Sequence, residues 1–488
     1  MTRRLSEILR RDLADDPAIE GVTADSRKVK PGWLFAALPG ARADGREFVP
    51  AAVAAGAAAV LTEGRAAATV PVVEVRDARR AYALAAAAFW GAQPAVCVAV
   101  TGTNGKTSVA TFCRQIFQRL GRVSASMGTL GVRAGDVQIT PPSGLTTPDA
   151  GDVAALLADL AARGVTHLAL EASSHGVDQR RLDGVAITAS GFLNLTQDHL
   201  DYHGTMEAYR AAKLRLFEEL TPRGRTAVLN ADSDAYPAFA AAAVTSGLSV
   251  FSVGAMGEGL TLASRSLAPD GQRLRIGTAG RNFDVRLPLA GAFQASNALV
   301  AAGLCIAAGE GAEDVLAALE HIEGAPGRLQ RVGVGRLGGE AYVDYAHTPD
   351  GLSNALLALR PHAKGRLIVV FGAGGDRDRG KRPQMGAIAA SLADIAIVTD
   401  DNPRSEDPAA IRAEIRAGAA GLRDIGDRRE AIRAAADMLR EGDVLVVAGK
   451  GHEQGQTVGA IIHPFDDVAE TAAALGLAPA PGAPPDHG

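Results

Sequence analysis

The sequence predicts an α/β protein built on parallel sheets. Short apolar runs alternate with Ala-rich segments of helical pattern along most of the chain, which is typical of βαβ units. One run, VCVAV at residues 96–100, passes directly into a glycine-containing loop. The chain has 488 residues, too many for one ordinary hydrophobic core, so we expect several domains.

We expect three domains and a short tail. Residues 1–93 predict a small α/β domain, with short strands at 33–38, 58–61 and 72–75. Residues 94–325 predict a larger parallel-sheet domain of P-loop type, with strands at 96–100, 166–171, 189–194 and 226–230. Residues 326–478 follow a Gly-Ala-Pro-Gly linker and predict a Rossmann-like domain, with strands at 341–344, 366–371, 395–399 and 443–447. The Pro- and Ala-rich residues 479–488 predict a disordered tail.

Composition excludes several classes of protein. The net charge of −5 leaves no basic footprint of the kind that nucleic-acid binding requires. The three cysteines lie far apart and predict neither a disulfide framework nor a zinc site, as in a reducing cytosol. No apolar stretch is long enough to insert into a membrane. We therefore expect a cytoplasmic protein, and a monomer.

The sharpest local signal is a phosphate loop between the strand at 96–100 and a following helix. Backbone N–H groups at such a helix start bind phosphate, a lysine adds charge, and a hydroxyl can bind Mg²⁺. The pattern G-x-x-x-x-G-K-[ST] is incomplete, because Val100 replaces its first glycine. An ordinary strand–helix turn is the alternative. The candidate phosphate-binding residues are Gly102, Thr103, Asn104, Gly105, Lys106, Thr107 and Ser108.

The loop TGTNGKT at 101–107 resembles the ATP loop of the Mur ligase and folylpolyglutamate synthase superfamily. Other matching segments follow in the family's order between about residues 24 and 467: LTTP at 145–148, EASSHGVDQRR at 171–181, NLTQDH at 194–199, YRAAKLRLF at 209–217, DYAHTP at 344–349, GGDR at 374–377, DNPR at 401–404 and GKGHE at 449–453. The set is similar to the Mur ligases that add meso-diaminopimelate. This resemblance implies ATP-dependent transfer of that amino acid to the D-Glu carboxylate of UDP-MurNAc-L-Ala-D-Glu through an acyl phosphate.

The resemblance implies a catalytic and metal-binding group. Lys106 and Mg²⁺ would neutralise charge on the migrating phosphoryl group. Thr107, Glu171 and His199 would bind Mg²⁺, together with Lys213 after CO₂ has converted its amine to a carbamate (N6-carboxylysine). Taken alone, Glu171 could equally be a strand-end charge in water, and Lys213 a solvated charge on a helix.

The resemblance also assigns binding residues for both large substrates. Further ATP contacts would come from Asn297, Arg328, Asp344 and His347. The UDP-MurNAc-dipeptide would be held by Ser26, Arg42, Thr146, Thr147, Ser173, Gln179 and Arg181. Ser26 lies in the short motif DSR, for which helix capping is an alternative. Leu145 stands where related enzymes can carry a polar Asn.

The incoming amino acid would meet a group centred on the segment DNPR. Meso-diaminopimelate differs from lysine by one extra carboxylate, and an arginine fork binds a carboxylate through two points. The residues implied are Arg377, Asp401, Asn402, Pro403, Arg404, Gly449 and Glu453. Lysine-adding relatives lack the arginine at position 404.

Three alternative functions stay open on the sequence. A lysine-adding Mur ligase is disfavoured by Arg404, and a folylpolyglutamate synthase would not require the DSR, LTTP or DNPR segments. A non-catalytic nucleotide-binding homologue would have no reason to retain Lys106, Glu171, His199 and Lys213 together.

Overall fold

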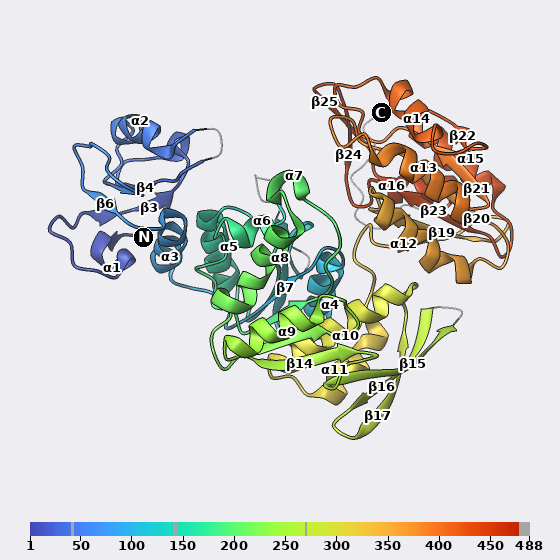
Figure 1. Cartoon of the computed structure of the whole chain (residues 1–488), viewed down its shortest axis with the longest axis horizontal. Helices are drawn as coiled ribbons and strands as arrows, with labels where there is room; N and C mark the ends of the chain where they lie inside the picture. The colour runs from blue at the N-terminus through green and yellow to red at the C-terminus, as the bar shows by residue number, and fades with distance from the viewer. Residues whose placement is uncertain (41–42, 136, 140–144, 269–270, 478–488) are drawn as a thin grey trace. The chain divides into compact units, whose positions relative to one another are not determined.

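The computed structural model describes residues 1–40, 43–135, 137–139, 145–268 and 271–477 (Figure 1). These residues form two compact units. The first comprises Met1–Ser264, Arg275–Val285 and Ser296–Leu319, and the second comprises Arg265–Leu274, Arg286–Ala295 and the chain from Glu320. No helix among the described residues is long and apolar enough to cross a membrane.

The N-terminal part of the first unit is a small parallel sheet. Its strands follow the order β3 (Gly21–Thr23), β4 (Trp33–Ala37), β5 (Ala59–Thr62), β6 (Val72–Glu74). Helix α3 (Ala78–Trp90) is capped by Asp77, whose carboxylate accepts from the Arg80 N–H. The remaining elements are β1 (Arg3–Arg4), α1 (Leu5–Leu9), β2 (Ala18–Ile19), η1 (Ser26–Lys28), η2 (Gly45–Phe48) and α2 (Val49–Ala54).

The parallel strands at the centre of the first unit belong to a long sheet, whose strands β15, β16 and β17 include residues of both units. Among described residues its order is β10-β9-β8-β11-β7-β12-β13-β14-β15-β16-β17. The strands β8 (Ser124–Gly128), β11 (His167–Glu171), β7 (Val96–Thr101), β12 (Ala189–Phe192), β13 (Thr226–Asn230) and β14 (Ser249–Gly254) run parallel. The others are β9 (Gly131–Ala134), β10 (Val137–Ile139), β15 (Leu260–Ala268), β16 (Gly271–Thr278) and β17 (Arg281–Leu287).

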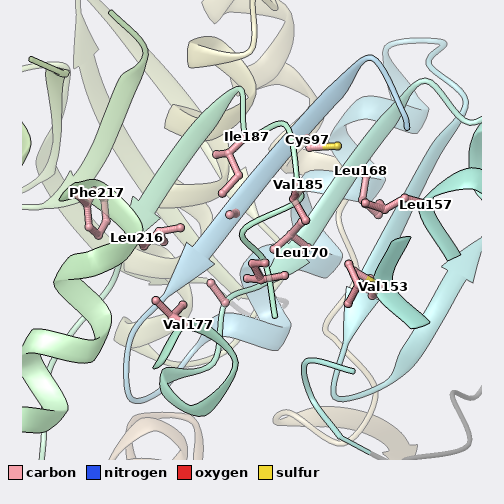
Figure 2. Close-up of a cluster of buried hydrophobic side chains, with 14 of the residues drawn as sticks. Cys97, Val153, Leu157, Leu168, Leu170, Val177, Val185, Ile187, Leu216 and Phe217 are labelled. Atoms are coloured by element: carbon pink, nitrogen blue, oxygen red, sulfur yellow. The ribbon is translucent and has the colours of Figure 1, made fainter. Parts of the chain in front are cut away.

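Apolar side chains fix the register of this sheet. Cys97 and Leu168 pair across β7 and β11, and both side chains are fully buried (Figure 2). They join one cluster with Leu157 of α5 (Ala150–Ala162) and Phe217. Because the strands are parallel and paired in this register, their last residues, Thr101, Glu171 and Phe192, lie at the same, carboxyl end of the sheet. That end is where α/β proteins place functional groups.

The other helices of the first unit connect these strands. They are α4 (Lys106–Arg119), α6 (Ser174–Asp178), α7 (Leu200–His203), α8 (Met206–Arg215), the π-helical turn η3 (Leu216–Leu220), α9 (Tyr236–Thr245), α11 (Ala312–Ala318) and η4 (Leu319–His321). Helix α10 (Ala292–Ala307) belongs to both units by sequence.

The second unit contains a six-stranded sheet of described residues with a core on each face. Its order is β18 (Gln330–Val334), β19 (Glu340–Asp344), β23 (Val444–Ala448), β20 (Leu367–Phe371), β21 (Ile395–Val398), β22 (Arg423–Asp424), and only β18 is antiparallel to its neighbour. One face packs on α12 (Pro349–Leu359), α13 (Lys381–Leu392) and α14 (Pro408–Arg416). The other face packs on α15 (Arg428–Met438) and α16 (Asp467–Leu475). The remaining elements are η5 (Arg360–His362) and the hairpin of β24 (Gly455–Val458) and β25 (Ile461–Pro464).

The predicted α/β class with parallel sheets is confirmed. Each strand expected in residues 94–325 and 326–478 is present within a few residues of its predicted position. The predicted boundaries after residues 93 and 325 stay predictions, and residues 479–488 lie outside the described part of the chain.

Candidate active site

The phosphate loop adopts the expected strand–loop–helix arrangement. Strand β7 ends at Thr101 and α4 begins at Lys106, directly after Gly105. Gly105 has a φ of 89°, and a Cβ there would lie 2.3 Å from the Asn297 side-chain oxygen. A glycine is therefore required by both backbone conformation and space. The same contact places predicted residue Asn297 beside the loop.

A second loop, which follows β12, braces the phosphate loop. The Asn104 N–H donates to the Asn194 side-chain oxygen (2.9 Å), and the Thr103 N–H donates to the Asn194 carbonyl (3.0 Å). The Thr103 hydroxyl donates to the Thr196 carbonyl (3.1 Å) and accepts from the Thr196 N–H (2.9 Å). These contacts fix the loop before any ligand binds, which lowers the entropic cost of binding.

Two lysines converge on one carbonyl of the loop. Lys106 Nζ donates to the Gly102 carbonyl (2.9 Å) and to the Thr103 carbonyl (2.8 Å). Lys213 Nζ donates to the same Gly102 carbonyl (2.8 Å), although Lys213 lies 111 residues further along the chain. Two ammonium groups this close repel each other, so the arrangement favours a neutral form of one of them.

Lys213 is enclosed by the protein. Its side chain is 1% exposed and its amine lies 4.4 Å from the centre of the Tyr209 ring. Burial, and then the positive charge of Lys106, hold the pKa of Lys213 well below its ordinary value. The π-helical turn η3 begins three residues later, and such turns recur at functional sites. The solvated-charge alternative for Lys213 is wrong.

Glu171 lies in the interior at the end of β11 and is 2% exposed. Its carboxylate accepts from the Thr129 N–H (2.8 Å) and from the Thr129 hydroxyl (3.2 Å). Thr146 contacts the same Thr129 hydroxyl (3.2 Å), and the Thr147 hydroxyl donates to the Glu171 carbonyl (3.0 Å). The solvated strand-end alternative is therefore wrong, and Glu171 adjoins two residues predicted to bind substrate.

The residues predicted to bind metal offer only a few oxygen and nitrogen atoms as metal ligands. In the described part of the chain, no three His, Cys, Asp or Glu side chains are grouped as a metal site. The Thr107 hydroxyl lies in the first turn of α4, and His199 follows the bracing loop, 3.4 Å from Asp198. Mg²⁺ commonly takes one or two carboxylates and completes its shell with phosphate oxygens and water. The oxygen donors of Thr107 and Glu171 fit that chemistry.

A cavity lined by two arginines lies close to Thr147. It has a volume of about 170 Å³, and Leu145, Gln179, Arg181 and Arg79 form part of its wall. Arg181 donates to the Thr147 carbonyl (2.6 Å) and to the Gln179 side chain (2.6 Å). Ser173 adjoins the Thr147 hydroxyl (2.9 Å), so four predicted substrate residues are brought together.

Two predicted contacts of the UDP-substrate are not placed in this group. Arg42 lies outside the described residues. Ser26 begins η1, where Asp25 accepts from the Arg27 N–H (3.1 Å) and pairs with the Arg27 guanidinium. The DSR motif therefore caps a helix, as the alternative interpretation expected, and the role of Ser26 stays a prediction.

Three predicted nucleotide residues lie in the second unit. Asp344 accepts from the Leu329 N–H (2.6 Å), and the Arg328 guanidinium stacks 4.3 Å from the centre of the Tyr345 ring. Burial raises the pKa of Asp344 to about 6, although Arg328 opposes the shift. His347 Nδ1 donates to the Tyr345 carbonyl (2.8 Å). Asp344 and Arg328 thus form one group of opposite charges.

The predicted amino-acid residues also lie together in the second unit. Asn402 donates to Glu453 (2.8 Å), and the backbone N–H of Arg404 donates to the Thr457 carbonyl (3.0 Å). A Cβ on Gly449 would lie 2.5 Å from a carboxylate oxygen of Asp401. Pro403 contributes backbone, and a Cβ on Gly375 would lie 1.9 Å from its carbonyl oxygen.

One residue of this group was not predicted from the sequence. Lys450 is fully buried and donates to the Asn402 side-chain oxygen (2.9 Å) and to Glu453 (3.1 Å). A lysine is rarely buried unless it is paired. In the sequence, only its position within the segment GKGHE indicated that Lys450 belongs to this group.

Three family profiles match the chain. The Mur ligase family catalytic domain matches residues 18–90, the Mur ligase middle domain matches residues 100–305, and the Mur ligase glutamate ligase domain matches residues 327–451.

Relatives and solved structures agree with these profiles. Relatives named UDP-N-acetylmuramoyl-L-alanyl-D-glutamate–2,6-diaminopimelate ligase are 71% identical in Caulobacter vibrioides and 54% identical in Bradyrhizobium diazoefficiens, and each match covers 97% of this chain and 99% of the relative. A solved structure of that name is 35% identical, with a TM-score of 0.75, covering 98% of this chain and 99% of its own. A folylpolyglutamate synthase of Mycobacterium tuberculosis is 20% identical (TM-score 0.64, covering 82% and 94%) and shares the fold alone. The chain belongs to the Mur ligase family.

Proposed function

We propose that this chain uses ATP to join meso-diaminopimelate to the D-Glu carboxylate of UDP-MurNAc-L-Ala-D-Glu. The observation that carries the proposal is the near-full-length similarity to ligases named for this reaction. Two features of the chain support it: a braced phosphate loop, and an arginine group suited to an amino acid with an extra carboxylate. The reaction makes an amide needed for a peptidoglycan precursor.

The residues of the first unit suit phosphoryl transfer to a carboxylate. The N–H groups at the start of α4 and the amine of Lys106 bind the ATP phosphates and neutralise charge as the γ-phosphoryl group leaves ADP. Arg181 holds a carboxylate of the dipeptide. The D-Glu carboxylate oxygen bonds to the γ-phosphorus as the bond to ADP breaks, which gives an acyl phosphate. The neutral amine of diaminopimelate then attacks the acyl carbon, the C–N bond forms, the nitrogen releases a proton to water, and phosphate leaves with one former carboxylate oxygen.

Mg²⁺ supplies additional positive charge for this transfer. Thr107 and Glu171 would hold it through oxygen, and His199 and Lys213 would contribute to a second site. An amine cannot bind Mg²⁺ while protonated, and Lys213 is enclosed beside a second amine. We assign Lys213 as a carbamate, formed when its amine attacks CO₂ and loses one proton.

The location of the ligase follows from the proposed substrates. ATP and a UDP-linked precursor are cytoplasmic metabolites, so we place the ligase in the cytoplasm. We also propose that the ligase is a monomer. Light scattering at micromolar protein concentration measures the molar mass of the particle and so tests whether it is a monomer.

Release of ADP tests the function. We expect ADP formation only when ATP, Mg²⁺, UDP-MurNAc-L-Ala-D-Glu and meso-diaminopimelate are all present, with one amide formed per ADP. ADP formed equally well with lysine in place of diaminopimelate would contradict the amino-acid assignment. ADP formed with folate and glutamate would contradict the acceptor.

The raised pKa of Asp344 predicts a pH dependence of nucleotide binding. With a pKa of about 6, Asp344 is ionised at pH 7 and largely protonated at pH 5, where its neutral carboxyl accepts a hydrogen bond from a ribose hydroxyl more weakly than the carboxylate does. We expect its contribution to ADP binding to fall about tenfold over this interval. Calorimetric titration of ADP at both pH values measures this.

The Asp344→Asn variant separates this effect from titration of the nucleotide itself. Asparagine keeps an acceptor oxygen and does not titrate, so the variant should lose only the part of the pH dependence that Asp344 causes. Identical pH profiles for both proteins would contradict the role of Asp344.

A further inference from the structure

Two loops of the second unit carry the arginines assigned to the amino acid. The first, residues 372–380, joins β20 to α13 and carries Arg377; the second, residues 399–407, joins β21 to α14 and carries Arg404. We call them the arginine loops. Because β20 and β21 are parallel neighbours, both loops lie at the same edge of the sheet.

Both arginine loops contain a residue in an unfavourable backbone conformation. Asp376 has a φ of 53° and Arg404 has a φ of 51°, in the left-handed region that non-glycine residues rarely adopt. Such conformations persist only where the surroundings hold them, and they cluster at functional sites.

Direct contacts join the two arginine loops. The Ser405 hydroxyl donates to the Asp376 carboxylate (2.6 Å), as does the Ser405 N–H (3.2 Å). The Gly375 N–H donates to the Asn402 carbonyl (2.9 Å), and Arg404 Nη1 donates to the Gly375 carbonyl (2.8 Å). The strained residues therefore lie inside one hydrogen-bonded frame.

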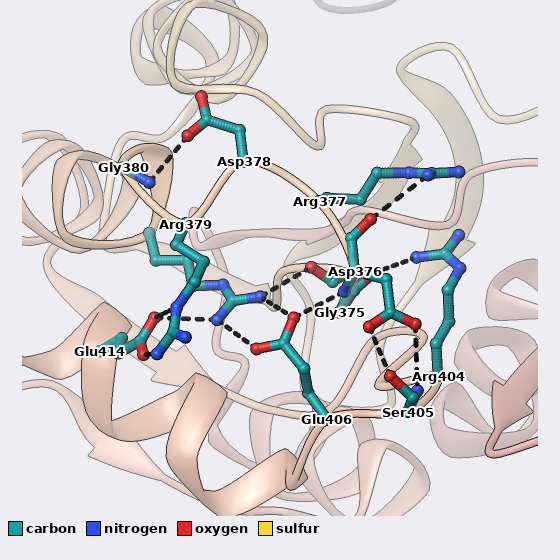
Figure 3. Close-up of polar contacts among 12 residues, drawn as sticks. Gly375, Asp376, Arg377, Asp378, Arg379, Gly380, Arg404, Ser405, Glu406 and Glu414 are labelled. Atoms are coloured by element: carbon teal, nitrogen blue, oxygen red, sulfur yellow. Dashed lines mark hydrogen bonds and ion pairs between the residues drawn. The ribbon is translucent and has the colours of Figure 1, made fainter.

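A buried arginine supports this frame through Glu406, which Figure 3 shows next to Asp376 and Ser405. The Arg382 side chain is fully buried, and it donates two bonds to Glu406, each 2.8 Å long. It also donates to Glu414 (2.8 Å) and to the Gly374 carbonyl (3.3 Å). Glu406 in turn accepts from the Asp376 N–H (2.6 Å), so the chain of contacts runs from Arg382 to both arginine loops.

The same contacts occupy the carboxylates that surround the two arginines. Hydrogen bonds from Arg382 are the main cause that lowers the pKa of Glu406 to about 2, so Glu406 stays ionised. Asp376 is occupied by Ser405, and Glu414 by Arg379 and Arg382. Among the described residues, no carboxylate forms an ion pair with Arg377 or Arg404. The hydrogen-bonding capacity of these acidic groups is thus taken up by other donors, although the charge of Arg404 also contributes to lowering the pKa of Asp376.

We propose that Arg382, Glu406 and Asp376 are positioning residues that fix the arginine loops and leave Arg377 and Arg404 available for a substrate carboxylate. This inference rests on the proposed function and deepens it. It locates the selection of a dicarboxylic over a monocarboxylic amino acid in a network that does not itself touch the substrate.

The test compares Glu406→Gln and Asp376→Ala with the unmodified ligase in steady-state kinetics. Glu406→Gln keeps the shape of the side chain and removes its charge; Asp376→Ala alters an exposed residue and leaves the core unchanged. For each variant we expect the KM for meso-diaminopimelate to rise about tenfold, as when one supporting charged contact is lost. The KM values for ATP and UDP-MurNAc-L-Ala-D-Glu should change less than about twofold.

Lysine provides the readout that a merely structural role would not change. Lysine lacks the second carboxylate, so its already low kcat/KM should stay within about twofold while preference for diaminopimelate falls about tenfold. Asp376→Asn should recover most of the loss, because asparagine tolerates left-handed backbone and accepts from Ser405. Arg416→Gln is the matched control: Arg416 lies at the end of α14, pairs with Asp424 of β22 at the surface and contacts neither arginine loop.

The outcomes separate this inference from the proposed function. If the unmodified enzyme shows no activity with diaminopimelate, the proposed function is wrong. If it prefers diaminopimelate and both variants keep that preference and the KM, the positioning role is wrong. An equal fall in kcat with diaminopimelate and with lysine, at unchanged KM values, would also overturn it, since that pattern indicates a general loss of structure.

Discussion

A Lys213→Met variant is expected to lose ligation by about 10²–10³-fold while it stays fully folded. Methionine nearly matches the volume of lysine and removes the amine. The unmodified amine is 1% exposed, and burial costs a charged group more than an apolar one. We therefore expect the thermal midpoint of the variant, measured by calorimetry, to equal or exceed that of the unmodified protein. Lost activity with retained stability assigns a chemical role to Lys213.

The proposed carbamate would explain why an amine occupies this position. Lys106 and Lys213 both donate to the Gly102 carbonyl, at 2.9 and 2.8 Å. Conversion of Lys213 to a carbamate replaces repulsion between two cations with attraction between a cation and an anion. It also supplies oxygen donors, which Mg²⁺ prefers. With ¹³C-labelled bicarbonate, we expect a carbamate resonance in the unmodified enzyme that is absent from Lys213→Met.

Arg210→Met is the matched control for this experiment. Arg210 lies on the same helix, α8, and is exposed, so its replacement should change neither the activity nor the resonance. Full activity of Lys213→Met would remove Lys213 from the mechanism. An inactive variant without a carbamate signal in the unmodified enzyme would retain the lysine and exclude its modification.

The sequence predicted those parts of the molecule whose signals are local. The strand at 96–100 is an unbroken apolar run, and the glycines and lysine after it are adjacent in the chain. Strand β8, with the sequence SASMG, was not predicted, because small residues give no apolar run. Its burial depends on the neighbouring strand β11, to which it is paired.

Residues that act through distant partners could not be predicted. Arg382 lies next to Lys381 in the first turn of α13, so the sequence alone suggests an exposed charged residue. It is buried because Glu406 and Glu414, 24 and 32 residues later, accept its hydrogen bonds. The bracing of Thr103 by Thr196 spans 93 residues in the same way. Family motifs predicted which residues contact ligands, whereas the contacts that hold those residues could be found only in the structure.

Replacing Arg404 with alanine tests which amino acid the ligase selects. If the guanidinium binds the second carboxylate of diaminopimelate, its loss should cost about 2–5 kcal/mol of transition-state binding. That corresponds to a fall in kcat/KM of about 30-fold to several thousand-fold. Kinetics with lysine should show an unchanged or higher kcat/KM, because the variant no longer leaves an unpaired cation beside the bound substrate. The preference for diaminopimelate would then largely disappear.

The backbone around Arg404 makes this substitution interpretable. The Arg404 N–H donates to the Thr457 carbonyl (3.0 Å), and its carbonyl accepts from the Gly459 N–H (2.7 Å), so the hairpin of β24 and β25 holds position 404 independently of the side chain. Arg404→Lys sharpens the result. A lysine retains the charge without the two-point fork, and we expect it to recover only a small part of the lost activity. Retained selectivity for diaminopimelate in Arg404→Ala would show that another group recognises the second carboxylate, and Arg377 on the neighbouring loop would then be the residue to replace.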